Sequence, residues 1–382
     1  MAISDLRITK VQVHRIEADL SERFGWSLNW TRRRRTTLVE VSTADGITGW
    51  GEGTWGGENL LRSPGVVIGR SAFEIEGIHE SLRAPSVNQR RTGPPCSAGL
   101  DIALWDIVGK ALGKPVCQLL GKVHRDRVEA YCTALYRKDW PDLAAGLAEE
   151  ALDWKRRGYR TMKMKTGYDP ATDERIVRAV REAIGPDIGL GVDSNCAYDA
   201  GTAIALARRL ERFDLMWWEE PLLADDLEGY ARLRNSTSIP IAAGESENAD
   251  WLHDNYVQPR LVDILQPDLE WVGLTGFRRL SHACWLGRIR MVPHNWGTAI
   301  RTAATLHAMA TCPPLTEALN PPRILFEFDR TESPFRDAVI EQRLDIGDDS
   351  AMGVPMGPGL GVDVVPGQVE QFRTDLQVID AR

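Results

Sequence analysis

The sequence predicts an α/β protein built around a parallel barrel, with a smaller mixed domain ahead of it. The chain has 382 residues, 43% of them hydrophobic, which is long for one ordinary domain and enough to bury a large core. After residue 125, short apolar runs alternate with amphipathic helical patterns eight times. Three of these runs end in acids spaced 26 residues apart, Asp193, Glu219 and Glu245. Such a βα repeat is typical of a barrel with a polar site at its mouth.

The first part of the chain is predicted to form an antiparallel sheet followed by a helical lobe. Residues 4–18 and 36–49 alternate apolar and polar side chains, with a typical Asp45-Gly46 tight turn. From Phe73 to Leu120, apolar residues recur at helical spacing until Gly113-Lys114-Pro115 stops the run.

These patterns divide the chain into two domains. We expect a capping domain over residues 1–125, to which residues 355–382 return, and a barrel domain over residues 126–354. The two domains should meet at the barrel mouth.

Two stretches without periodicity, residues 21–30 and 51–58, are predicted to be mobile loops. Both should close over the barrel mouth, where they would exclude water and select the substrate. An ordinary connection is the alternative interpretation. The candidates for substrate contact in these stretches are Arg23, Trp26, Trp30 and Trp55.

The barrel is expected to contain eight short strands. They cover residues 129–133, 161–165, 189–193, 215–219, 241–245, 263–266, 288–294 and 324–328. Helices are expected between them, for example over residues 173–184, 201–212 and 227–234. A barrel is favoured over an open doubly wound sheet, because no GxGxxG or GxxxxGK[ST] motif occurs.

Composition and charge exclude several classes of protein. The formal net charge of −8 and the pI near 5.5 argue against nucleic-acid binding. No apolar stretch approaches the roughly 20 residues that span a bilayer, and the N-terminus alternates like a strand. We expect a cytoplasmic protein without a nucleic-acid or membrane partner, whose six cysteines are reduced.

Polar residues stand at the ends of seven predicted strands, where the active site of a barrel lies. In chain order they are Lys163, Lys165, Asp193, Asn195, Glu219, Glu245, Asp268, His294 and Glu327. Three converging carboxylates need a cation, and an all-oxygen set favours Mg²⁺ first and Mn²⁺ second. We predict Asp193, Glu219 and Glu245 as the ligands; the alternative is that one of them pairs with a barrel arginine. Glu220 is disfavoured, because adjacent strand residues point in opposite directions.

Two groups are predicted to transfer protons. Lys163 and Lys165 share one face of a strand, and two ammonium groups in a partly desolvated site should lower each other's pKa, which would make one of them a base near neutral pH. His294 is the one histidine of seven that ends a predicted strand. Asp268 on the neighbouring strand is expected to fix its tautomer and raise its basicity.

Three further residues have expected roles at the mouth. Glu327 lies between apolar residues, so a raised pKa is expected to let it donate a hydrogen bond to an oxyanion; Glu317 is the weaker candidate. Asn195 should bind substrate or backbone, and Trp296 should help to select the substrate.

A divalent cation, a lysine and a His/Asp pair across one barrel fit a single chemistry. A base removes the proton α to a carboxylate, and the cation and the lysine stabilise the resulting enediolate.

These residues closely resemble the enolase superfamily, and within it the mandelate racemase subgroup, over nearly the whole chain. The matching motifs are Ala103-Leu104-Trp105-Asp106, Leu119-Leu120-Gly121, Lys163-x-Lys165, Asp193-x-Asn195, Glu219-Glu220-Pro221, Gly244-Glu245, Gln266-Pro267-Asp268, Pro293-His294 and Glu327. The muconate-lactonising and dipeptide-epimerase branches carry a lysine where Asp268 stands, and the glucarate-dehydratase branch carries Asn where Glu245 stands.

The resemblance implies a modified TIM barrel of the (β/α)7β type with an N-terminal α+β capping domain. It also implies Mg²⁺ dependence, Lys165 and His294 as the two bases, and assembly into homo-oligomers, either dimers or octamers. Two departures concern the site: Ser194 and Cys196 stand where related sugar-acid enzymes often have Ala and His.

Most members of this subgroup dehydrate acid sugars, so the expected function is Mg²⁺-dependent dehydration of an aldonate or aldarate to a 2-keto-3-deoxy acid. Residues 326–336 and 357–361 are most similar to members that handle aldarates and their lactones, including a galactarolactone cycloisomerase. Cycloisomerisation of an aldarolactone, or racemisation through the same enediolate, is the alternative. The alternative outside enzymes is an inactive sugar-acid-binding protein.

Overall fold

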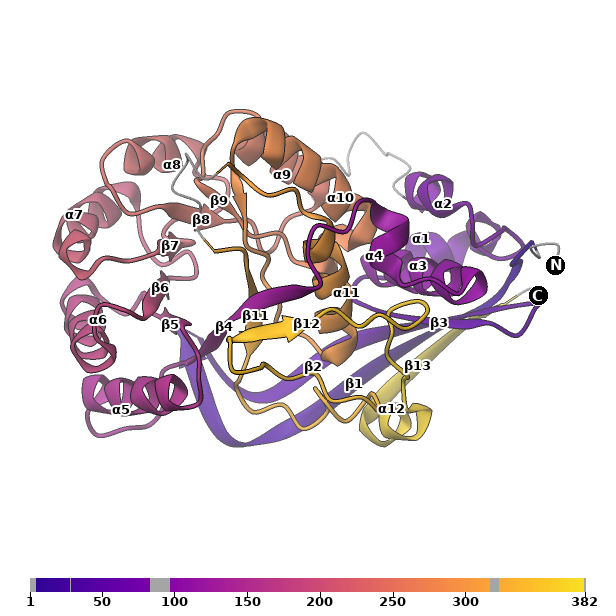
Figure 1. The fold of residues 1–382 in the computed structure, drawn as a ribbon, viewed down its shortest axis with the longest axis horizontal. Helices are drawn as coiled ribbons and strands as arrows, with labels where there is room; N and C mark the ends of the chain where they lie inside the picture. The colour runs from indigo at the N-terminus through magenta and orange to yellow at the C-terminus, as the bar shows by residue number, and fades with distance from the viewer. Residues whose placement is uncertain (1–4, 28, 83–96, 317–322, 381–382) are drawn as a thin grey trace.

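The computed structural model describes residues 5–27, 29–82, 97–316 and 323–380. Two sheets organise this part of the chain (Figure 1). One is an antiparallel sheet of four strands; the other is a curled sheet of parallel strands with helices around its outside. This is the predicted α/β class, a parallel half-barrel beside a capping sheet.

The curled sheet contains all eight predicted parallel strands, in the order β10-β9-β8-β7-β6-β5-β4-β11. Their bounds are β4 (Arg127–Leu135), β5 (Thr161–Lys165), β6 (Gly189–Asp193), β7 (Trp217–Glu219), β8 (Ile241–Ala243), β9 (Ile264–Leu265), β10 (Arg290–Met291) and β11 (Leu325–Asp329). Within the described residues β10 and β11 are not paired, so the hydrogen-bonded ring is open there. The short β12 (Ala351–Gly353) adds to β4 in the antiparallel direction.

Strands β7 to β10 are shorter than predicted, and the residues after them explain part of the difference. Gly244 leaves β8 at a φ of 117°, a conformation that favours glycine. Pro267 and Pro293 follow β9 and β10, and a proline has no amide hydrogen for a sheet ladder.

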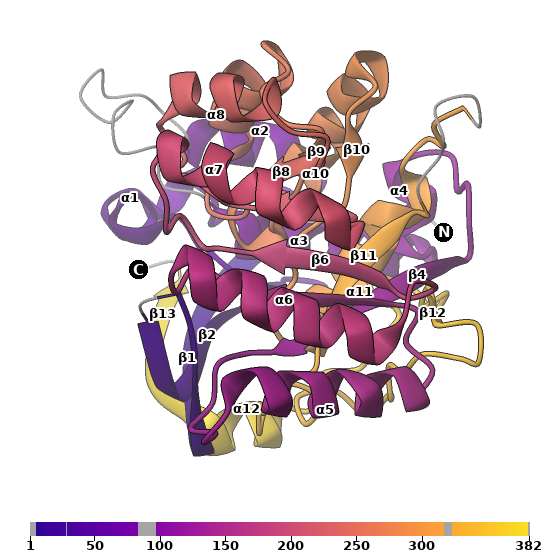
Figure 2. The same cartoon turned by 90° about the vertical axis from the view of Figure 1, so that its left-hand side faces the viewer.

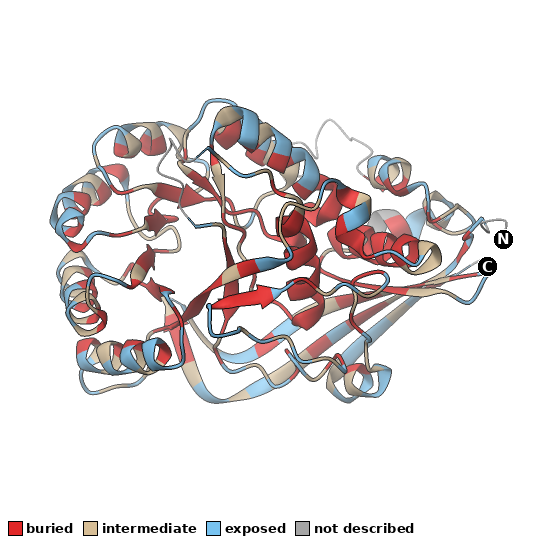
Figure 3. Ribbon diagram, in the orientation of Figure 1, coloured by how far each residue is buried: buried red, intermediate tan, exposed pale blue. Residues whose placement is uncertain are grey.

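Amphipathic helices cover the outside of this sheet. They are α5 (Leu143–Arg156), α6 (Pro170–Ile184), α7 (Ala200–Leu210), η3 (Glu211–Phe213), α8 (Leu227–Arg234), α9 (Ala249–Leu252), η4 (His253–Val257), α10 (Leu269–Gly287) and α11 (Ala299–Thr311). Helices α5 to α8 lie side by side (Figure 2), with buried inner faces and exposed outer faces (Figure 3). Each of these four begins at an aspartate whose side chain accepts backbone N–H groups of the first turn. None of the described helices combines the length and the apolar character that crossing a bilayer requires.

The capping sheet has the strand order β13-β1-β2-β3. Its strands are β1 (Ile8–Trp26), β2 (Asn29–Thr43), β3 (Thr48–Glu52) and β13 (Arg373–Asp380), and the helices beside it are α1 (Gly57–Arg62), η1 (Pro64–Val66), α2 (Ile75–Leu82), α3 (Ala98–Leu112), α4 (Val116–Leu120) and α12 (Pro366–Phe372). Strand β13 pairs antiparallel with β1, with Val11 opposite Ile379. Helix α3 packs so close to β3 that a Cβ on Gly51 would lie 1.9 Å from the Gly99 carbonyl oxygen.

The prediction of a loop over residues 21–30 is wrong. Strands β1 and β2 continue through it as a long hairpin, in which Phe24 lies opposite Thr31 and Gly25 opposite Trp30. Gly25 also pairs with Arg137 beyond β4, through hydrogen bonds of 2.8 and 2.9 Å. The ladder shifts register between Asp19 and Phe24, which hides the strand alternation in the sequence. The hairpin therefore carries the capping sheet to the barrel.

The second predicted loop, residues 51–58, is only partly a loop. Glu52 ends β3 and Gly57 begins α1, so residues 53–56 alone form the connection. Part of the predicted helical lobe, residues 83–96, and the alternative residue Glu317 lie outside the described residues. The five described cysteines are free thiols.

Candidate active site

Three of the predicted site residues form one row across the curled sheet. Lys165 lies opposite Asp193 in the pairing of β5 with β6, and Asp193 lies opposite Glu219 in the pairing of β6 with β7. Glu245 follows β8 through the bend at Gly244. One carboxylate oxygen from each of Asp193, Glu219 and Glu245 lies within 4.8 Å of the other two. The strands thus bring together the three acids that the sequence predicts as ligands.

This carboxylate cluster fits a hard divalent cation. Its donors are all oxygens, the ligand type that Mg²⁺ and Mn²⁺ prefer. Oxygen Oε2 of Glu245 and the side-chain oxygen of Asn195 are buried, and no described residue donates a hydrogen bond to either. Buried carboxylates so close together repel one another unless positive charge lies between them.

Glu219 is oriented by residues from three strands or strand ends. Its Oε1 accepts from Lys163 Nζ at 2.5 Å, and its Oε2 accepts from Gln266 Nε2 at 2.7 Å and Trp217 Nε1 at 3.1 Å. Burial raises the pKa of Glu219 to about 8, although Lys163 opposes the effect. We did not identify Trp217 from the sequence, because an apolar strand residue carries no local sign of this bond.

The two lysines have raised pKa values, so the predicted net lowering is wrong, although Lys163 does act to lower the pKa of Lys165. Burial lowers the pKa of Lys165, but Asp193, to which its ammonium donates, and Tyr136 raise it, and the net shift is upward. Lys163 lies 2.9 Å from Glu327 and 3.6 Å from Asp193, in addition to Glu219, and its pKa is also raised. The prediction weighed the two ammonium groups against each other and left out the carboxylates that face them.

His294 and Asp268 form the predicted pair. Nδ1 of His294 lies 2.5 Å from Oδ2 of Asp268, and Nε2 lies 3.6 Å from Glu245 and 3.7 Å from Glu327. Burial alone would lower the pKa of His294, but Glu245, Glu327 and Asp268 together raise it to about 10. The imidazole therefore turns Nδ1 to Asp268 and Nε2 to the carboxylate cluster.

Glu327 is an ionised acceptor and not the predicted donor. It accepts from Thr133 Oγ1 at 2.6 Å and from the Asn295 amide at 3.1 Å. Burial would raise its pKa, but Lys163 and His294 outweigh burial and hold the pKa at about 2. The apolar neighbours in sequence misled the prediction, because the charges around Glu327 come from other strands.

An aromatic cluster lies between the hairpin and the barrel. The ring of Trp26 lies 5.8 Å from that of Trp296, and the guanidinium of Arg34 stacks 3.7 Å from the Trp296 ring. Nε1 of Trp296 is buried, and none of the described residues accepts a hydrogen bond from it. Arg23 instead binds Asp139 through two hydrogen bonds, and Trp55 packs against the core.

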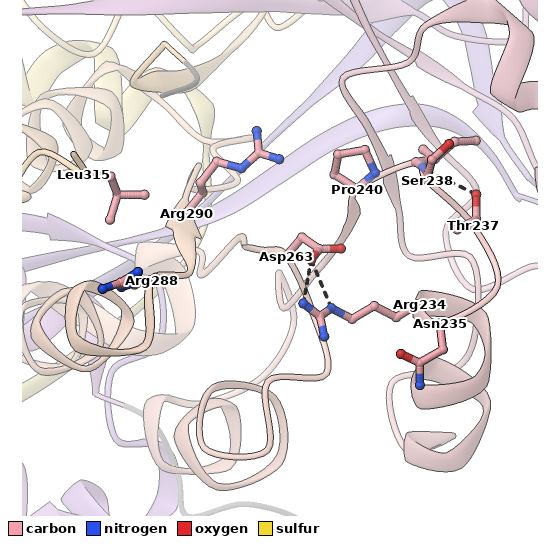
Figure 4. Close-up of a pocket in the computed structure, with 10 residues that line it drawn as sticks. Arg234, Asn235, Thr237, Ser238, Pro240, Asp263, Arg288, Arg290 and Leu315 are labelled. Carbon is pink, nitrogen blue, oxygen red and sulfur yellow. Dashed lines mark hydrogen bonds and ion pairs between the residues drawn. The ribbon is translucent and has the colours of Figure 1, made fainter. Parts of the chain in front are cut away.

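The opposite end of the barrel holds a separate cavity of about 450 Å³ (Figure 4). Its lining residues Pro240, Asp263 and Arg290 stand at the beginnings of β8, β9 and β10, whereas the acids described above stand at strand ends. Arg234 binds Asp263 across this cavity. None of the described residues that line it is a predicted site residue.

Comparison with known proteins agrees with this geometry. Residues 11–121 match the family described as Mandelate racemase / muconate lactonizing enzyme, N-terminal domain, and residues 146–368 match Enolase C-terminal domain-like. The chain belongs to the enolase superfamily. It is accordingly an enzyme, and its barrel mouth is where a member of this superfamily is expected to act.

Several relatives of this enolase superfamily enzyme have assigned activities. The D-galactarolactone cycloisomerase of Agrobacterium fabrum is 36% identical over 96% of this chain and 99% of its own length. The arabinonate dehydratase of Saccharolobus solfataricus is 29% identical over 88% of this chain and 90% of its own. The crystal structure of the 3,6-anhydro-D-galactonate cycloisomerase from Zobellia galactanivorans superposes with a TM-score of 0.82 at 35% identity, covering 97% of this chain and 100% of that one.

Proposed function

We propose that this enzyme eliminates the β-oxygen substituent of an acid sugar, with Mg²⁺-dependent dehydration of an aldonate or aldarate as its reaction. The observation that carries the proposal is the placement of two proton-transfer groups around one carboxylate cluster. Lys165 binds Asp193, and His294 reaches Glu245 with Nε2 at 3.6 Å. A proton can therefore leave the substrate toward one group while the other serves the leaving oxygen.

Asp193, Glu219 and Glu245 would hold the cation, which we propose is Mg²⁺, with Mn²⁺ as a substitute. Bound there, it would supply positive charge against the substrate carboxylate and so make the α proton more acidic. The protein's own contribution is to fix the ligands: Lys163, Gln266 and Trp217 all hydrogen-bond to Glu219.

The residues then divide the proton transfers. With the cation bound, its positive charge would offset the carboxylates that raise the pKa of Lys165 and of His294, so one of the two groups could lose its proton. Lys165 or His294, depending on the configuration at C2, would then take the α proton, and Lys163 would offer its ammonium to the enediolate oxygen. The other of the two groups gives a proton to the C3 hydroxyl, which leaves as water. The enol that remains tautomerises to the 2-keto-3-deoxy acid. Trp296, whose N–H has no acceptor among the described residues, and Trp26 are proposed to contact the sugar chain.

Cycloisomerisation is the second candidate, because two relatives that are 35% and 36% identical in sequence to this chain are cycloisomerases. In that reaction the leaving oxygen belongs to a ring, so the same two proton transfers open the ring and release no water. Racemisation would need only the exchange of the α proton.

A substrate screen in D₂O followed by proton NMR tests the proposal. We expect Mg²⁺-dependent formation of a 2-keto-3-deoxy acid from at least one open-chain acid sugar, and D-galactarolactone, 3,6-anhydro-D-galactonate and arabinonate belong in the set. Product from the cyclic compounds alone would favour cycloisomerisation, and α-deuterium exchange without elimination would favour a racemase. Binding without turnover of any compound would support an inactive sugar-acid-binding protein. Assembly into dimers or octamers and a cytoplasmic location stay predictions.

A further inference from the structure

A fully buried carboxylate of the capping sheet reaches the barrel. Glu52 ends β3 and accepts four hydrogen bonds. Thr36 Oγ1 donates at 2.8 Å from the neighbouring strand β2. The other three come from Thr298, the N-cap of α11: its amide donates to both oxygens at 3.0 and 2.9 Å, and its hydroxyl donates at 2.5 Å. A negative charge at a helix N-terminus is favourable, so this carboxylate fixes where α11 begins.

A buried arginine connects Glu52 to the proton-transfer pair. Nη2 of Arg301, in the first turn of α11, lies 3.5 Å from Glu52, and Nη1 lies 3.2 Å from Oδ1 of Asp268. The same Nη1 also binds Glu270. Oδ2 of Asp268 is the oxygen that holds Nδ1 of His294 at 2.5 Å. Charges of alternating sign thus run from Glu52 through Arg301 and Asp268 to His294, and the first three residues are at most 2% exposed.

We propose that Glu52 and Arg301 are positioning residues of the reaction. Arg301 holds the plane of the Asp268 carboxylate, which in turn orients the imidazole, and Glu52 holds Arg301 and the start of α11. The capping sheet therefore completes a proton-transfer group of the barrel. The assignment of a step to His294 rests on the function proposed above, whereas the orientation of its ring does not.

The packing at Gly297 shows how little freedom this chain of contacts has. A Cβ at Gly297 would lie 2.1 Å from Nε of Arg301 and 2.6 Å from Oε1 of Glu52. Neither atom can move away easily, because both side chains are buried and bound on several sides. Glycine at this position lets the Glu52 and Arg301 side chains approach each other.

Orientation matters here because proton transfer depends steeply on geometry. A misplacement of about 1 Å can reduce a rate by about 100-fold. Without Arg301, Oδ1 of Asp268 would keep its hydrogen bond from the amide of Glu270, at 2.7 Å. It would lose the second donor, the Arg301 guanidinium, and with it the contact that prevents rotation of the carboxylate. The imidazole could then turn with the carboxylate.

The test compares Glu52→Gln, Arg301→Met and Arg301→Lys with the wild type. The first readout needs no substrate: the short Nδ1–H hydrogen bond of His294 is expected to give a far-downfield proton resonance, assigned by its loss in His294→Asn. We expect Arg301→Met to shift or abolish this resonance, Glu52→Gln to shift it, and Arg301→Lys to restore part of it. Thermal melting checks folding, and if Arg301→Met does not fold, the other two variants carry the test.

The second readout uses the acid sugar found in the screen. We expect kcat to fall about 100-fold in Arg301→Met and about tenfold in Glu52→Gln, with KM within about twofold, because neither residue is proposed to touch substrate. Arg301→Lys should recover part of the loss.

Asp101→Asn is the matched control. Asp101 is a buried acid of helix α3 that also crosses to the barrel side, where it accepts from Thr275 of α10, but it does not contact Arg301 or Asp268 in the described structure. It should keep the wild-type resonance and kcat. The inference is overturned if Glu52→Gln and Arg301→Met keep both, or if Asp101→Asn loses them equally. If the wild type turns over no acid sugar, the proposed function fails, while the resonance still decides the orientation.

Discussion

The two sides of the candidate site are built in different ways. On the barrel side, Lys165, Asp193 and Glu219 stand in one row because neighbouring parallel strands place their last residues at the same edge. On the capping side, Trp26 and Glu52 reach the site from a hairpin and a strand whose partners lie far away in sequence. The first arrangement follows from a local repeat, and the second follows from tertiary packing.

This difference separates two kinds of contribution. Under the proposed function, the barrel side would present charged groups to a cation and to the reacting carbon, so changes there should act on the chemical step. The hairpin side presents aromatic surface, so changes there should act on substrate binding. The Glu52 to His294 chain is the place where the two sides meet.

Removal of the divalent cation should abolish turnover entirely. Without a cation, the cluster offers only negative charge to the substrate carboxylate, and the α proton stays too weakly acidic. Dialysis against EDTA followed by titration with Mg²⁺, Mn²⁺ and Ca²⁺ measures the effect. Full activity after complete chelation would show that the barrel side works without a metal. The assignment of the chemical step to a cation on the barrel side would then be wrong.

Asp193→Asn should lower kcat by about 1,000-fold, because the variant loses one of the three anionic ligands proposed to hold the cation that stabilises the negative charge developing on the substrate. Asp187→Asn is the control: Asp187 is an exposed acid that precedes the same strand β6, at the opposite end from Asp193. It should keep wild-type kcat and wild-type Mg²⁺ dependence. Equal losses of kcat in the two variants would mean that the substitutions disturb strand β6, and that the place of Asp193 in the carboxylate cluster does not explain the effect.

Trp26→Ala on the hairpin should raise KM and lower kcat/KM about tenfold while kcat changes little, because it removes binding surface that ground state and transition state share. Steady-state kinetics on the identified acid sugar give both constants. Trp285→Ala, which alters a 44% exposed tryptophan of α10, is the matched control and should leave both unchanged. A fall in kcat alone would show that the hairpin takes part in the chemical step, and the two sides would no longer differ.

Acidification should lower the free energy of unfolding of the protein, because His307 takes up a proton on unfolding. This buried residue of α11 accepts from the Cys117 amide through Nδ1 and bonds the Leu360 carbonyl through Nε2, and burial lowers its pKa to about 4. The unfolded chain binds the proton near pH 6.5 and the folded chain does not, so stability falls as the pH drops from about 7 toward 4. Between pH 7 and 5 we expect about 2 kcal/mol of loss from this residue.

Denaturant unfolding at pH 7 and pH 5 measures that loss. His307→Gln removes the titrating group, so its free energy of unfolding should change less between the two pH values than that of the wild type. An identical pH dependence in the two proteins would show that other groups cause the acid sensitivity. Among these variants, His307→Gln should change turnover at pH 7 the least, because the hydrogen-bond partners given by the described structure for His307, Cys117 and Leu360, are not site residues.

The barrel side could be predicted from sequence because each of its residues obeys a local rule. Asp193 and Glu219 end short apolar runs, and that position alone places them at the mouth of a parallel barrel. The same rule would have identified Glu52, which ends the run Thr48–Glu52, but the flanking glycines made the stretch look like a loop. What the rule cannot supply is the partner: Glu52 and Thr298 are 246 residues apart.

The electrostatic predictions failed for a related reason. The direction of the pKa shift at Lys165 and at Glu327 depends on which charges face them, and these come from other strands. Asp193 and Tyr136 raise the pKa of Lys165. Lys163 and His294 lower the pKa of Glu327. Sequence neighbours report burial, which is one cause of a shift, but the sign at a crowded site is set by all the causes together.

The pairing of β1 with β13 has a consequence for how the chain is made. Val11 meets Ile379 only after the whole barrel has been synthesised, so the capping sheet has an unpaired edge at β1 during most of translation. Contacts of such long separation are slow to form, and an open edge can pair with another chain in the meantime. We therefore expect the pairing of β13 with β1 to be a late step of folding, during which the edge of β1 stays open.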